Sequence, residues 1–101
     1  SMTVTVEDCT FTKCGKVDTA NDYFAPARFV NNSAVGTLTV SLKNNTFADT
    51  IGTNGDILLG DYRTGRASHA LTATIVTETP VMVKSSADAA YSYNGGTITL
   101  N

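Results

Sequence analysis

The sequence predicts an all-β domain in which short strands stack as successive coils. Residues 4–11 and 40–47 repeat one pattern at a separation of 36 residues, with apolar residues at the first, third and eighth positions and a polar corner between them. A repeated unit of strand, polar corner and inward-facing aromatic residue is typical of stacked β-coils. Apolar residues nowhere keep a helical period for more than about two turns, which argues against helices.

Length and composition indicate one small extracellular domain. The chain has 101 residues, so residues 1–101 are expected to form a single domain. Charged residues make up only 16%, and Thr, Ser, Asn and Gly take their place, which is typical of secreted or cell-surface β-proteins. The net charge of −2 argues against nucleic acid as a partner, and no apolar run is long enough for membrane insertion. Ser1 and Met2 are interpreted as an expression remnant, and we expect the domain to be a fragment of a longer protein.

The first round contains strands and one irregular loop. Residues 3–6 alternate and are rich in β-branched side chains, which predicts a strand, and Asp8 marks the corner that follows. Residues 16–27 have no regular pattern and are expected to leave the coil as a loop. Residues 28–30 then recover strand character.

The second round repeats the first with clearer alternation. Residues 37–42 alternate strictly, and residues 57–59 form a short apolar run, as expected of a buried strand. Asn44 and Asn45 occupy the corner between them, because Asn tolerates left-handed backbone and its amide can bond along the stack. The polar residues 60–66 form a second loop.

The third round is expected to end the stack. Residues 71–75 alternate, and residues 81–83 continue beyond Pro80, which must lie at a bend or at an unpaired edge because it lacks an N–H donor. Residues 89–93 and 97–100 flank a Gly-rich turn, a spacing that favours a hairpin closing the end of the stack.

The repeat also resembles a known family. Residues 4–15 resemble a coil of the right-handed parallel β-helix proteins, and residues 38–52 match the same pattern with Asn45 in place of Cys9. Residues 54–62 are similar to coils in large surface proteins of gut Gram-positive bacteria. The resemblance implies a short right-handed parallel β-helix of about three coils with a C-terminal hairpin-like cap. An antiparallel β-sandwich is the alternative fold.

The fold and resemblance favour a structural role. We expect a non-catalytic structural or adhesive module of a bacterial extracellular surface protein that contacts a glycan or a cell-wall polysaccharide. The end rungs of a short stack expose backbone donors and acceptors, which predicts a homodimer through an end rung unless a cap or further coils cover them.

The alternative function is polysaccharide cleavage, because related β-helices include lyases and glycoside hydrolases. Such a reaction needs two carboxyl groups about 5–10 Å apart, and adjacent coils lie about 4.8 Å apart. Asp22, Asp56 and Asp61 are the candidate catalytic residues, since they lie in or beside the irregular loops. The competing interpretation is structural, because Asp beside Gly or Asn at a corner usually caps a turn.

Aromatic residues offer a binding hypothesis. Tyr23, Tyr62, Tyr91 and Tyr93 could form a platform on which sugar rings stack. Tyr91 and Tyr93 share a strand face because they are two positions apart. The competing interpretation is that some of these tyrosines close the core.

No cofactor and no metal site is predicted. Cys9, Cys14 and the single His69 are too few ligands for a structural zinc site. The two cysteines are expected to pack inward as small apolar residues, and a short local disulfide is the alternative.

Overall fold

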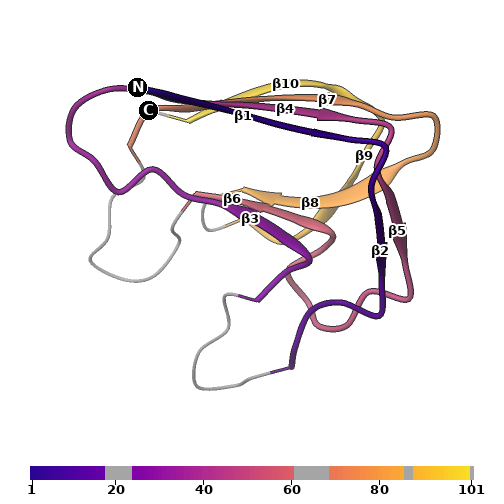
Figure 1. Ribbon diagram of the computed structural model, residues 1–101. Coiled ribbons are helices and arrows are strands. Elements are labelled where there is room, and N and C mark those ends of the chain that lie inside the picture. Colours follow the sequence, from indigo (N-terminus) through magenta and orange to yellow (C-terminus); the bar gives the residue numbers. More distant parts are fainter. Residues whose placement is uncertain (18–23, 61–68, 86–87, 101) are drawn as a thin grey trace.

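The computed structural model describes residues 1–17, 24–60, 69–85 and 88–100, and their regular structure consists of strands in three sheets (Figure 1). The strands are β1 (Met2–Glu7), β2 (Thr10–Thr12), β3 (Ala27–Phe29), β4 (Leu38–Lys43), β5 (Thr46–Ala48), β6 (Ile57–Leu59), β7 (Leu71–Val76), β8 (Val81–Ser85), β9 (Tyr91–Tyr93) and β10 (Gly96–Leu100).

The chain visits the sheets in turn and then returns to the first. The sheet orders are β1-β4-β7-β10, β2-β5 and β3-β6-β8-β9, so each early round adds one strand to each sheet. Five pairings between the described strands are parallel, and two are antiparallel. In Figure 1, β1, β4 and β7 follow one another along one side of the stack, and β2 and β5 form another side. The predicted all-β stack of coils is confirmed, and its mostly parallel pairing differs from an antiparallel β-sandwich.

The predicted register of the first two coils is confirmed. Val6 pairs with Leu42, and Phe11 pairs with Phe47, so the separation of 36 residues in the sequence is the register of both sheets. The two Phe rings stack with their centroids 5.0 Å apart and an angle of 8° between their planes. Parallel in-register strands bring equivalent residues of successive coils into contact, which is why the repeat stabilises the stack.

The hydrophobic core lies in the second and third coils. Alternation in β4 and β7 places every second side chain inward, and these side chains are buried against those of β6 and β8. The buried apolar residues are Leu38, Val40, Leu42, Ile57, Leu58, Leu59, Leu71, Ala73, Ile75, Val81 and Val83. Val4 and Val6 of the first coil face the same way and are half-buried, because β1 is an edge strand among the described residues.

Left-handed residues make the corners. Asp8 and Asn44 have φ of 55° and 54°, and they occupy equivalent positions in successive coils. Lys13 and Asp49 have φ of 54° and 55° at the next corner. A single left-handed residue between two extended segments turns the chain sharply, which directs it from one sheet to the next. Because the first two coils share this pattern, each bend occurs at the equivalent residue of both coils.

The C-terminal strands cover one end of the stack, but they do not form the predicted hairpin with each other. Strand β9 pairs antiparallel with β8, and β10 pairs antiparallel with β7, in a different sheet. The chain therefore reverses direction after β8 and lays one antiparallel rung on the last parallel coil. Pairing each strand with the free edge already present covers both sheets, whereas a β9–β10 hairpin would leave both edges open.

Loss of core volume should destabilise the whole stack. Leu59 is fully buried, so we expect Leu59→Ala to lower the free energy of unfolding by about 2–5 kcal/mol in urea denaturation. The matched control is Val35→Ala, because Val35 is 80% exposed and its truncation should change stability by less than about 0.5 kcal/mol. Equal effects of the two substitutions would contradict this placement of the core.

Relief of backbone strain should stabilise a corner. Lys13 has φ of 54°, a region that costs non-Gly residues about 1 kcal/mol or more, so Lys13→Gly should raise the free energy of unfolding by about 0.5–1 kcal/mol. Lys43→Gly is the control, because Lys43 lies in the regular strand β4, where Gly destabilises. Thermal unfolding of both variants measures the difference, and a loss of stability in Lys13→Gly would contradict the corner geometry.

Candidate functional site

The first coil leaves one end of the stack open. Strands β1, β2 and β3 each form the edge of a sheet at this end. Two cavities open between them, of about 520 Å³ beside β1 and about 270 Å³ between β2 and β3. Met2 and Val4 line the first cavity, Phe11 lines the second, and Phe29 lines both. We call this set of strands and cavities the open end.

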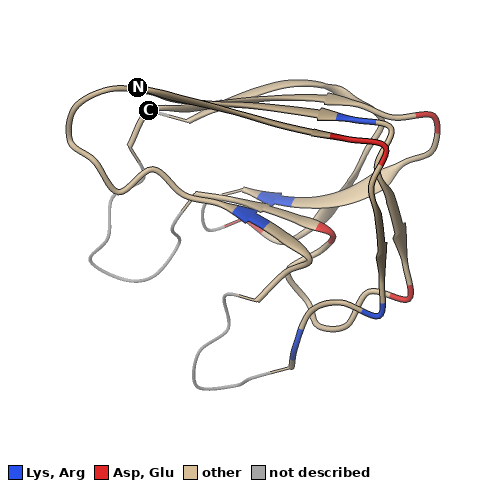
Figure 2. Cartoon of the chain, viewed as in Figure 1, with Lys and Arg blue, Asp and Glu red and all other residues tan. Residues whose placement is uncertain are grey.

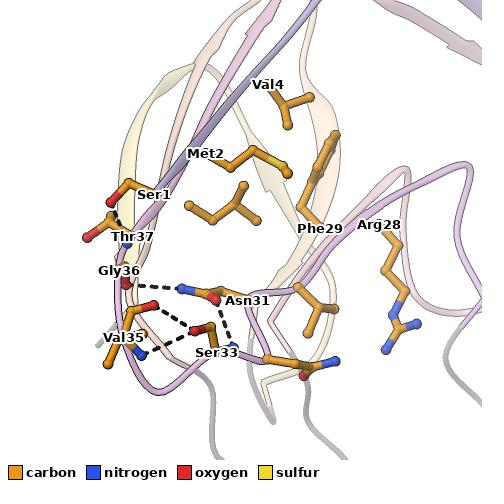
Figure 3. Close-up of a pocket in the computed structure, with 13 residues that line it drawn as sticks. Ser1, Met2, Val4, Arg28, Phe29, Asn31, Ser33, Val35, Gly36 and Thr37 are labelled. Atoms are coloured by element: carbon orange, nitrogen blue, oxygen red, sulfur yellow. Dashed lines mark hydrogen bonds between the residues drawn. The ribbon is translucent and has the colours of Figure 1, made fainter.

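A hydrogen-bonded loop forms the rim of the larger cavity (Figure 3). The Ser33 N–H donates to Asn31 Oδ1 at 3.0 Å, and the Ser33 hydroxyl donates to the Val35 carbonyl at 2.7 Å. Asn31 Nδ2 donates to the Ala70 carbonyl at 2.8 Å, which ties the rim to the start of the third coil. In Figure 3, Met2, Val4 and Phe29 lie together in the cavity, so its walls are largely apolar and its rim is polar.

A second, polar groove follows the corner between β1 and β2. It has a volume of about 460 Å³. Its lining consists of hydroxyl, amide and carboxylate side chains from successive coils: Asp8, Asn44, Asn45, Thr46, Thr77, Glu78 and Thr79. We call it the corner groove.

Asn45 joins the first two coils at this groove. The Cys9 N–H donates to Asn45 Oδ1 at 3.0 Å, and Asn45 Nδ2 donates to the Val6 carbonyl at 3.0 Å. Both backbone groups lie beside the corner, where the ladder between β1 and β4 ends. The expectation that Asn amides bond along the stack is therefore confirmed, and Asn45 has a structural role.

Asp56, one of the candidate catalytic acids, is engaged in similar bonds. Its Oδ1 accepts the Thr50 hydroxyl at 2.6 Å, and its Oδ2 accepts the Met82 N–H of the third coil at 2.8 Å. Its carbonyl accepts the Ala27 N–H of the first coil at 3.2 Å. Asp56 thus contacts all three coils. Asp22 and Asp61 lie outside the described residues, so the convergence of the three acids stays a prediction.

Charged side chains are dispersed around the described part of the chain. Figure 2 shows acidic and basic residues spread over several corners and strands rather than gathered in one place. Within the described residues, no three His, Cys, Asp or Glu side chains gather closely enough to hold a metal ion. None of the described residues belongs to a helix that could cross a membrane.

Two of the four candidate glycan-binding tyrosines are described. Tyr91 and Tyr93 contact each other edge to face, with ring centroids 6.0 Å apart. Tyr93 packs against the hydrophobic core, whereas Tyr91 is 37% exposed. Tyr23 and Tyr62 lie outside the described residues. Of the two described tyrosines, Tyr91 is therefore the one whose ring is exposed for a sugar to stack on.

The expectation for the cysteines is wrong in one respect. Cys9 is exposed and Cys14 is half-exposed, so Cys9 does not pack inward. Their thiols donate to the nearby carbonyls of Glu7 and Thr12. Both cysteines are free thiols in the structure, so it does not contain the alternative local disulfide. The left-handed backbone of Asp8 changes the direction of the chain just before Cys9. The alternation of the preceding strand therefore does not predict which way the Cys9 side chain points.

No family profile, curated protein or solved structure matches this chain, so its functional assignment depends on the geometry described above.

Removal of the Asn45 amide should weaken the contact between coils. We expect Asn45→Ala to lower the free energy of unfolding by about 1–3 kcal/mol, because the Cys9 N–H and the Val6 carbonyl each lose their hydrogen bond to this side chain. Asn32→Ala is the control, since Asn32 is exposed on a loop. Urea denaturation compares the two, and an Asn45→Ala variant as stable as the parent chain would refute the structural role of this amide.

Proposed function

We propose that this protein is a non-catalytic structural module, a segment of right-handed parallel β-helix within a secreted or cell-surface bacterial protein. It acts as a spacer or adhesive element and contacts glycans with its corners. The right-handed coil is the expected one, because connections between parallel strands of one sheet are right-handed in about 98% of cases.

The observation that carries the proposal is the bonding of Asp56. A general acid or nucleophile must present a carboxyl oxygen to the substrate. Both Asp56 carboxyl oxygens already accept hydrogen bonds, from the Thr50 hydroxyl and the Met82 N–H. A carboxylate used in this way holds two segments together, and this supports a structural rather than a catalytic role.

The polar corners support the same conclusion. Asn31, Asn45 and Asn54 each donate a side-chain hydrogen bond to a backbone carbonyl at least 30 residues away in the sequence. Asn54 is only 2% exposed. These amides add a second kind of contact between coils, and the Ala70 carbonyl accepts both the Leu38 N–H and the Asn31 amide. Conformational rigidity across several coils is what a spacer requires.

Glycan contact is supported by the composition of the surface. The corner groove offers hydroxyl, amide and carboxylate groups that can exchange hydrogen bonds with sugar hydroxyls. Tyr91 adds an exposed ring on which a sugar face can stack.

A panel of plant, host and bacterial cell-wall polysaccharides tests the proposal with two readouts. The first is the release of reducing ends and of unsaturated sugars. We expect none above buffer from the parent chain, and we expect Asp56→Asn to lower the melting temperature through weaker bonds to Met82. Sugar release that both Asp56→Asn and Asp61→Asn abolish would establish the cleavage alternative instead.

The second readout is retention of the protein on the immobilised glycans. We expect Tyr91→Ala to lose retention and Met82→Ala to keep it, since Met82 is 40% exposed and offers no ring. A parent chain that no glycan retains would remove the adhesive part of the proposal and leave the spacer.

A further inference from the structure

The outer face of the sheet β1-β4-β7-β10 carries hydroxyl side chains in regular rows. Every second side chain of each strand points inward, so the side chains between them form the outer face. The register aligns these outer residues across all four strands. The first row is Thr3, Thr39, Thr72 and Thr99, and the second row is Thr5, Ser41, Thr74 and Thr97. We call these eight residues the hydroxyl array.

The array repeats at a fixed distance in each of two directions. Neighbouring strands lie about 4.8 Å apart, and two residues along a strand span about 6.4–6.8 Å. Figure 1 shows the four strands running in nearly the same direction along one side of the molecule. The sheet therefore presents a small two-dimensional lattice of hydroxyl groups.

The core beneath the sheet holds this lattice in place. Between the two rows, Val40 and Ala73 point inward and are at most 1% exposed. Thr is branched at Cβ, which restricts the rotamers of its side chain. A partner that binds the array therefore finds the hydroxyls already ordered, and little conformational entropy is lost on binding.

The hydroxyls of the array are available to solvent. Ser41 and Thr72 are half-exposed, and the other six residues are exposed. Among the described residues, the side-chain hydrogen bond within the array joins Thr74 Oγ1 and Thr97 Oγ1 at 3.2 Å. A hydroxyl group offers one donor and two acceptor positions, so each member can still bond to an external group.

The array contains neither a charge nor an aromatic ring. Glu7 and Lys43 occupy the next outward row along the strands, where charged residues begin. None of the eight residues lines the cavities of the open end or the corner groove. Sites for small soluble ligands are concave, and sugars stack on aromatic rings. The array therefore does not resemble a site for a soluble sugar.

Strand propensity accounts for single Thr residues on an exposed face but not for two complete rows. The other four-stranded sheet shows what this chain places outward elsewhere. Its outer face mixes charged, apolar and hydroxyl side chains, namely Arg28, Leu58, Met82, Lys84 and Ser92. The regular composition of the array is thus specific to one face.

We propose that the hydroxyl array binds the surface of ice. A single bond from a hydroxyl to water is weak, because liquid water offers the same bond. Several such bonds add up when they form together on a rigid scaffold, and only a partner that repeats in two dimensions can form them together. The prism faces of ice present oxygen atoms at spacings close to those between strands and between alternate residues. Ice is also uncharged, as the array is.

Partition into slowly growing ice tests this assignment. An advancing ice front excludes dissolved proteins, whereas a protein that binds ice is incorporated. We expect the parent chain to be enriched in ice grown on a cold finger and to slow ice recrystallisation. Thr39→Tyr should remove both effects, because a ring in a central strand would hold the rest of the array away from the ice surface.

The matched control is Thr12→Tyr, because Thr12 is exposed in strand β2, outside the array. We expect Thr12→Tyr to partition like the parent chain. Circular dichroism establishes that each variant folds, and Thr74→Tyr replaces Thr39→Tyr if that variant does not. A parent chain excluded from ice, a folded array variant that stays in ice, or a Thr12→Tyr variant excluded from ice would each overturn the proposal.

Crystalline cellulose and chitin are also solids with periodic hydroxyl groups, so retention on both is measured with the same variants. We expect no retention that Thr39→Tyr removes. Such retention without ice binding would overturn the proposal and assign the face to a solid polysaccharide. The array shares no residue with the corner groove and does not include Tyr91, so neither result decides the proposed glycan contacts at the corners.

Discussion

The structure depends on in-register parallel stacking of β1, β4 and β7. Val6, Leu42 and Ile75 lie at equivalent positions of successive coils, so one column of apolar contacts runs through the stack. A shift of one residue in any coil would turn every inward side chain outward. The repeated alternation therefore fixes the register of the ladders. The corners lie at equivalent positions of successive coils because this register is kept.

The polar residues of the repeat serve this stacking. Corners interrupt the backbone ladders, and the side chains of Asn45 and Asp56 supply hydrogen bonds to neighbouring coils where the ladders are broken. Both carboxyl oxygens of Asp56 already accept hydrogen bonds within the protein. The corner groove and the cavities of the open end are the hollows that the stack leaves uncovered among the described residues.

The two ends of the molecule differ because the chain reverses direction only once. After β8, the antiparallel strands β9 and β10 cover the last parallel coil. The inward residues of the first coil, such as Val4 and Phe29, are half-buried, as are Ile98 and Leu100 of β10 at the opposite end.

The sequence by itself determined most of the strands, the corners at Asp8 and Asn44 and the register of the first two coils, because alternation and the separation of 36 residues are patterns that these coils repeat. It also pointed to Asn45 as a bond between coils. It did not reveal β2 and β5 as strands or the corners at Lys13 and Asp49. Only the tertiary structure decided the partners of β9 and β10, the exposure of Cys9 and the bonding of Asp56. These features depend on which edges and backbone groups remain unpaired after the coils have stacked, and no short stretch of sequence encodes that.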